Sequence, residues 1–70
     1  MEIRYDPEAD AMYIEFREGD FGRNKKIDDF TIIDFDKEGN ILGIELLEVS
    51  KRMPAKSFSK VRLKNLVAVA

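Results

Sequence analysis

The 70-residue chain has a formal net charge of −2 and contains neither cysteine nor histidine. Its length fits one small domain, and its composition excludes disulfide bonds, zinc sites of the usual Cys/His kind and catalysis by a thiol or an imidazole. A chain of this size buries only about 60% of the surface that it exposes when unfolded, so self-association is the remaining way to stabilise it.

The charges are distributed unevenly along the chain. Residues 1–50 hold all 14 acidic residues and six basic ones, a balance of −8, whereas residues 51–70 hold six basic residues and no acidic one, a balance of +6. Such asymmetry is typical of an acidic body with a basic arm that binds nucleic acid. The arm has little aromatic content for base stacking, which favours another interpretation, in which it docks on an acidic sheet of its own or a sister chain.

No targeting or membrane segment is recognisable in the sequence. No apolar run approaches the roughly 18 residues that a membrane-spanning helix requires, and the N-terminal ten residues lack the basic region and apolar stretch of a signal peptide. We therefore expect a soluble, cytoplasmic protein that does not bind membranes.

Two short strands are predicted at the N-terminus. Residues 2–6 form the first, which ends at Pro7 because proline lacks an N–H group and fixes φ. The sequence DPEAD that follows is typical of a tight turn. The second strand covers residues 11–17, where Met12, Ile14 and Phe16 alternate with the remaining residues and form the predicted core face.

The middle of the chain has a less regular pattern. Two glycines with polar neighbours predict a loop over residues 18–24, and the third strand is expected to begin at residues 25 and 26. The acidic pair at positions 28 and 29 interrupts the alternation, and the apolar residues that follow do not share one parity. A β-bulge near residues 28–30 would shift the parity and bring the two sets of apolar residues into one strand.

The stretch from Thr31 to Leu47 has two apolar runs joined by the sequence DKEGN, which predicts a β-hairpin with Gly39 at a position of positive φ. Strand side chains alternate between the two faces. The predicted buried face holds Ile33, Phe35, Leu42, Ile44 and Leu46, and the opposite face holds Ile32, Ile41 and Leu47. So large an apolar fraction on the second face indicates that something covers it.

The strand pattern ends after residue 48. Ser50 is a predicted helix cap and Pro54 limits the turn that follows, so one or two short helical turns are expected between residues 50 and 58. Residues 60–69 alternate again, which favours a final strand. The predicted fold is α+β: a four-stranded antiparallel β-meander, one or two helical turns and a C-terminal strand. It forms one domain, with a core over residues 1–53 and a basic extension over residues 54–70.

Two segments resemble a known family. The sequences YDPEADAMYI, over residues 5–14, and IDFDKEGNILGIELLEVSKRM, over residues 33–53, are similar to a small prokaryotic family called domain of unknown function 2283. The resemblance covers residues 1 to about 53. It implies an antiparallel meander followed by a short helical segment. It implies little about function, although some members are suspected to be antitoxin-like partners of small toxins.

The acidic hairpin resembles a calcium-binding loop in its spacing. Asp34, Asp36, Glu38, Gly39 and Glu45 match positions 1, 3, 5, 6 and 12 of an EF-hand loop. An EF-hand needs a helix on each side, whereas the flanking sequences here alternate as strands. We therefore expect no metal site and no cofactor, and cation binding at this loop stays an alternative.

Catalysis is not expected from this sequence. Its serines have no histidine to activate them, and no dinucleotide-binding or phosphate-loop signature is present. The expected function is a protein-interaction module, acting as a homodimer or as the partner of another small protein. Nucleic-acid binding through the basic C-terminal segment is a further alternative. The candidate interaction residues are Phe30, Ile32, Ile41, Leu47, Lys51 and Arg52.

Overall fold

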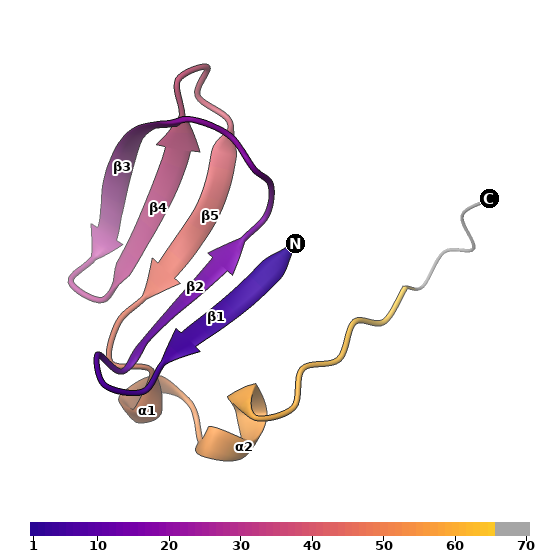
Figure 1. Cartoon of the computed structure of the whole chain (residues 1–70). Helices are drawn as coiled ribbons and strands as arrows, with labels where there is room; N and C mark the ends of the chain where they lie inside the picture. Colours follow the sequence, from indigo (N-terminus) through magenta and orange to yellow (C-terminus); the bar gives the residue numbers. More distant parts are fainter. Residues whose placement is uncertain (66–70) are drawn as a thin grey trace.

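The computed structural model describes residues 1–65 and contains a five-stranded antiparallel sheet with two short helices at one end (Figure 1). The strands are β1 (Glu2–Asp6), β2 (Ala11–Glu15), β3 (Phe21–Asp28), β4 (Thr31–Asp36) and β5 (Ile41–Leu46). The helices are α1 (Val49–Arg52) and α2 (Ala55–Phe58). The α+β class and the short helical turns that follow the sheet are confirmed.

The strand count differs from the prediction of four. Residues 21–28 form a separate strand, β3, and residues 29 and 30 form a turn in place of the predicted bulge. The Asp28 carboxylate accepts a hydrogen bond from the Phe30 N–H at 2.8 Å, and this side-chain contact closes the turn. The loop expected over residues 18–24 therefore covers residues 16–20 only.

The sheet is not a simple meander, because its strand order is β1-β2-β5-β4-β3. Residues 16–20 cross one end of the sheet from β2 to the outer strand β3 (Figure 1). The Leu42 carbonyl on β5 accepts hydrogen bonds from the N–H groups of Phe16 and Arg17 at 2.7 and 3.4 Å, which hold this crossing in place. The apolar β5 takes the centre, and β3, with every residue exposed, takes an edge. Two lysines on β3 discourage pairing with another strand.

Register pairs define two faces of the sheet, because residues directly opposite each other project to the same side. On the apolar face, Ile14 of β2 and Ile33 of β4 both pair with Ile44 of β5. On the polar face, Tyr13 and Ile32 both pair with Glu45. The apolar side chains of the first face are Ile3, Tyr5, Met12, Ile14, Ile33, Phe35, Ile41, Ile44 and Leu46.

The β4–β5 hairpin has the expected strands but a different register near its tip. Asp34 pairs with Gly43, and Phe35 pairs with Ile41, so Leu42 has no register partner on β4. Ile41 therefore stands opposite Phe35, and the prediction that it lies on the other face is wrong. The pairing of Ile33 with Ile44 on the buried side is confirmed.

The turn explains this shift in register. The Asp36 N–H donates to the Asn40 carbonyl at 2.8 Å, and the Asp36 carboxylate accepts hydrogen bonds from the N–H groups of Glu38 and Asn40 at 2.9 and 2.8 Å. Gly39 has a φ of 88°, as predicted. A three-residue loop closed in this way fixes the pairing of Phe35 with Ile41 at the tip. Leu42 is the extra residue in β5, and it allows Asp34 to pair with Gly43 in the rest of the hairpin.

The buried core is small. Among residues 1–65, the buried hydrophobic side chains are Met12, Leu42 and Val49. Phe16, predicted on the core face, is 38% exposed because β2 ends one residue earlier. A sheet with so few buried side chains is a single layer with little covering it.

Helix α1 is tied to the β1–β2 turn. The Val49 N–H donates to the Asp10 carbonyl at 3.0 Å, and the Ser50 hydroxyl donates to the Asp10 carboxylate at 2.7 Å. Ser50 therefore lies inside the helix and does not cap it. The capping position belongs to Glu48, whose φ is 52°. The β1–β2 turn, and not a local cap, holds this helix in place.

The chain leaves the sheet after α2. The Phe58 ring packs on Tyr5 of β1, with the ring centroids 4.6 Å apart, and the following residues run away from the sheet (Figure 1). Residues 60–65 form no strand, contrary to the prediction for residues 60–69, because no strand lies beside them to pair with their backbone. Residues 66–69 of that prediction lie outside the described residues.

Candidate functional site

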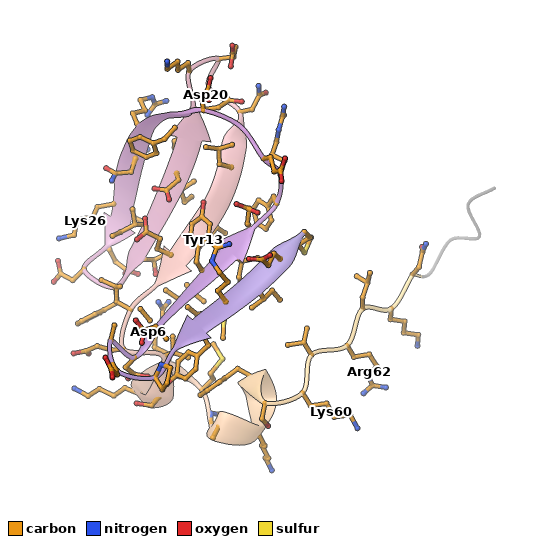
Figure 2. The ribbon with its side chains drawn as sticks, viewed as in Figure 1. Asp6, Tyr13, Asp20, Lys26, Lys60 and Arg62 are labelled. Carbon is orange, nitrogen blue, oxygen red and sulfur yellow. The ribbon has the colours of Figure 1, made fainter. Side chains whose placement is uncertain are left out.

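Three neighbouring strands bring titratable side chains together on the polar face. Tyr13 of β2 pairs with Glu45 of β5, and Asp34 of β4 pairs with Gly43, two residues from Glu45 on the same strand. We call Tyr13, Asp34 and Glu45 the carboxylate cluster. Figure 2 shows Tyr13 near the middle of the sheet, away from both helices.

A glycine makes this arrangement possible. A Cβ at Gly43 would lie 2.7 Å from the hydroxyl oxygen of Tyr13, 2.8 Å from its Cζ and 2.4 Å from the Ile14 carbonyl oxygen. These distances are shorter than van der Waals contact, so only glycine leaves room for the Tyr13 ring on β5. The phenol thereby reaches across β5 towards Asp34, the register partner of Gly43 on β4.

The cluster concentrates negative charge that its surroundings do not neutralise. Asp34 is only 8% exposed, and its Oδ1 has no hydrogen-bond partner among residues 1–65. Burial raises the pKa of the Glu45 carboxyl, and the neighbouring Asp34 carboxyl raises it further. Burial also raises the pKa of the Tyr13 phenol, as do the charges of Asp34, Glu15 and Glu45. The site is therefore electrostatically prepared for a positively charged group.

The nearby basic residues are engaged elsewhere. The Arg4 guanidinium lies 5.0 Å from the centroid of the Tyr13 ring, but its ion pair is with Glu2. Lys26 pairs with Asp29 at 3.5 Å. In the part of the chain that the structure describes, no ion pair involves Asp34 or Glu45.

A pocket of about 530 Å³ opens beside the cluster, between the β1–β2 turn and β5. Its lining includes Tyr13 and Glu45 from the cluster, together with Arg4 and Asp6 from β1. The pocket gives an extended side chain access to the acidic groups, with the Tyr13 ring as an apolar wall. Its chemistry suits a long cationic side chain, whose apolar stem and charged end need different surroundings.

The predicted calcium-binding spacing does not form a calcium-binding loop. Asp34 and Glu45 lie on paired strands, and the Asp36 carboxylate accepts hydrogen bonds from Glu38 and Asn40 in the turn. Within residues 1–65, no group of three or more acidic side chains is placed to hold a metal ion. The two residues that close the predicted loop, Asp34 and Glu45, nevertheless meet in the carboxylate cluster.

The six predicted interaction residues do not form one site. Phe30, which is 42% exposed, lies near Leu47 and Arg52, because its carbonyl accepts hydrogen bonds from the Leu47 N–H at 2.8 Å and the Arg52 Nη1 at 2.7 Å. Ile32 is half-buried on the polar face. Ile41 is the first residue of β5, is 44% exposed and lies opposite Phe35, at the far end of the hairpin from Phe30. The structure therefore brings Phe30, Leu47 and Arg52 together and separates them from Ile41. Lys51 pairs with Glu48 at 3.4 Å.

Sequence reasoning missed two residues of the candidate site. The alternation over residues 11–17 places Tyr13 on the face opposite the predicted core, and the hairpin pattern gives Gly43 no role. One signal was available, since a glycine inside an apolar strand marks close approach of another group. The group that approaches Gly43 is the Tyr13 ring, and only the pairing of β2 with β5 identifies it.

In residues 1–65, no helix is long and apolar enough to cross a membrane. No curated protein and no solved structure matches the chain. A family model described as protein of unknown function (DUF2283) matches residues 2–50, which span all five strands and the start of α1. The match covers most of the chain, and the resemblance found in the sequence is thereby confirmed. The chain belongs to the DUF2283 family.

Proposed function

We propose that the protein is a non-enzymatic interaction module that acts as a homodimer through its apolar face. The observation that carries the proposal is the openness of this face. Ile3 is 38% exposed, and Ile14, Ile33 and Ile44 are only half-buried although they lie at the middle of three strands. Helices α1 and α2 have four residues each and lie at one end of the sheet (Figure 1).

A single-layer sheet needs a second layer over its apolar side, because stable domains pack at least two layers around a core. A second copy supplies a layer of matching size and chemistry. Two such faces packed together form a β-sandwich, with side chains from both inner faces in the core. A two-fold dimer requires only one self-complementary surface, which makes the homodimer the simplest occupant.

Charged side chains border this face and give the dimer an orientation. The Arg23 guanidinium of β3 lies 4.5 Å from the centroid of the Phe35 ring, and Lys25 pairs with Ile33. These bases line only the β3 side of the face, because β3 is the edge strand next to β4. Their mutual repulsion favours the orientation in which the β3 strands of the two copies lie apart.

The test is sedimentation equilibrium of the full chain at tens of micromolar. The proposal expects a dimer, and it expects Ile3→Lys to weaken dimerisation at least about tenfold, because a lysine would enter the apolar interface. Phe21→Lys is the matched control: Phe21 is 55% exposed and pairs with Asp36 on the polar face. A monomeric wild-type chain, or equal effects of both substitutions, would contradict the proposal. A wild-type chain that is monomeric alone and dimerises only when mixed with another small protein would contradict the homodimer and assign the face to that protein, which is the antitoxin-like alternative.

A further inference from the structure

Two sets of charges in the molecule lack partners, and their signs are opposite. In the carboxylate cluster, Asp34 Oδ1 is buried without a hydrogen bond, and Glu45 lies in the same cluster without an ion pair among residues 1–65. After α2, Lys60, Arg62 and Lys64 are exposed, and none of them forms an ion pair with another described residue. Figure 2 shows Lys60 and Arg62 on the segment that runs away from the sheet.

We propose that the carboxylate cluster binds the basic segment Lys60–Lys64 of a second copy of the chain. This inference rests on the proposed homodimer and adds a second contact to it. The cluster lies on the polar face, away from the apolar dimer interface, so the segment reaches it around the edge of the partner's sheet. The segment has no acidic residue and follows an acidic body, so the chain carries both halves of the contact. A docked cation would reach Glu45 through the pocket and would offset the negative charge of Asp34 beside it.

The alternation of the segment fits this role. In an extended chain, Lys60, Arg62 and Lys64 project to one side at intervals of about 6.6 Å, and Val61 and Leu63, which are 61% and 90% exposed, project to the other. The central arginine suits the cluster best, because the planar guanidinium matches carboxylate geometry and lies well against an aromatic ring. The pocket beside Tyr13 and Glu45 admits its stem.

The geometry favours a second copy over the chain's own segment. Phe58 packs on Tyr5 and anchors the start of the segment at the helix end of the sheet. From there the chain runs away from the sheet, whereas Tyr13 lies near its middle (Figures 1 and 2). A segment that points outward at its anchor is placed to reach a neighbouring molecule.

The first experiment measures dimerisation by sedimentation equilibrium of the full chain at low salt. Reversing the charge of the segment with Lys60→Glu, Arg62→Glu and Lys64→Glu gives the segment-reversed chain. These substitutions are expected to raise the dimer dissociation constant at least about tenfold. The matched control, Lys37→Glu, reverses one charge in the exposed hairpin turn and is expected to change the dimer dissociation constant less than about twofold. An unchanged constant in the reversed chain would overturn this inference and leave the homodimer standing, whereas a monomeric wild type would overturn the homodimer itself.

The second experiment distinguishes docking between chains from docking within one chain. Asp34→Asn with Glu45→Gln neutralises the cluster while preserving its shape. A mixture of this variant with the segment-reversed chain can form a heterodimer that has one intact cluster and one intact segment. The inference expects the heterodimer to be at least about tenfold tighter than either variant homodimer. No gain on mixing would assign the segment to its own cluster and overturn the inference.

A third measurement addresses nucleic acid as the occupant of the basic segment. Fluorescence anisotropy of a mixed-sequence DNA duplex and an RNA oligonucleotide is recorded with the wild-type and segment-reversed chains at about 150 mM salt. The inference expects no difference between the chains. DNA or RNA binding that is lost on reversal while dimerisation stays unchanged would overturn it.

Discussion

The Tyr13 ring lies against the backbone of Gly43 on the neighbouring strand, where a Cβ would stand 2.7 Å from the phenol oxygen. This contact lets one side chain of β2 extend across β5 towards β4. The carboxylate cluster, and with it the unneutralised charge of the polar face, depends on this absence of a side chain.

Gly43→Ala is therefore expected to destabilise the fold by about 1–3 kcal/mol, the usual cost of forcing an extra group into a packed site. The Ile14 carbonyl oxygen, 2.4 Å from the added Cβ, belongs to the backbone and moves only with β2. Urea denaturation followed by circular dichroism measures the loss. Asn24→Ala, an exposed substitution on edge strand β3, is the control. A loss at Gly43 within about 0.5 kcal/mol of this control would show that the strands separate easily.

Local sequence patterns were sufficient to predict the two hairpins. The proline-aspartate turn after β1 and Gly39 between β4 and β5 fix these reversals through backbone preferences that act within five residues. The pairing of β2 with β5 joins residues 28 to 34 positions apart, and no local preference determines it. β3 was predicted only in part, because a carboxylate contact at Asp28, and not a glycine or proline, closes its turn with β4.

The candidate site could not be predicted for the same reason. Asp34 and Glu45 were noticed for their spacing, but their meeting on one face depends on the register of β4 with β5. Tyr13 joins them only through the non-local β2–β5 pairing. The positive charge of the basic segment, in contrast, is evident from composition alone.

Glu45→Gln is expected to raise the melting temperature at neutral pH by a few degrees. Burial and the neighbouring Asp34 raise the pKa of Glu45 above its usual value of 4.5. A raised pKa in the folded state means that the associated stability is present at low pH and is lost as the pH rises through the folded value. The neutral glutamine removes that loss.

The difference in melting temperature between Glu45→Gln and wild type should therefore grow as the pH rises from about 4 to 7. Calorimetry at concentrations below the dimer dissociation constant avoids interference from a docked segment. Glu18→Gln, in the exposed loop after β2, is the matched control. A pH-independent difference for Glu45→Gln would show that its carboxyl is well solvated in the folded chain.

Ser50→Ala is expected to loosen the attachment of α1 and to lower the melting temperature by several degrees. The Ser50 hydroxyl and N–H both donate to the Asp10 carboxylate, at 2.7 and 3.1 Å. The hydroxyl contact is the largest of the causes that lower the pKa of Asp10. Ser57→Ala in α2 is the control, because within residues 1–65 the Asp10 carboxylate accepts hydrogen bonds from Tyr5 and Ser50 and not from Ser57. Equal effects of both substitutions would remove the special role of the Ser50 contact.

Asp36→Asn is expected to make the free energy of unfolding depend less on pH in the acidic range. Burial opposes ionisation of Asp36, but hydrogen bonds from Asn40 and Glu38 outweigh it and lower its pKa below 3.8. For a depressed pKa, the stability is present above the unfolded value and is lost as the pH falls through the folded one. Urea midpoints measured from about pH 5 to pH 2 should fall less steeply in Asp36→Asn than in wild type, from a lower starting value. Asp20→Asn, in the exposed crossing loop, should retain the wild-type slope. Parallel profiles for Asp36→Asn and wild type would mean that the turn holds its geometry without the carboxylate.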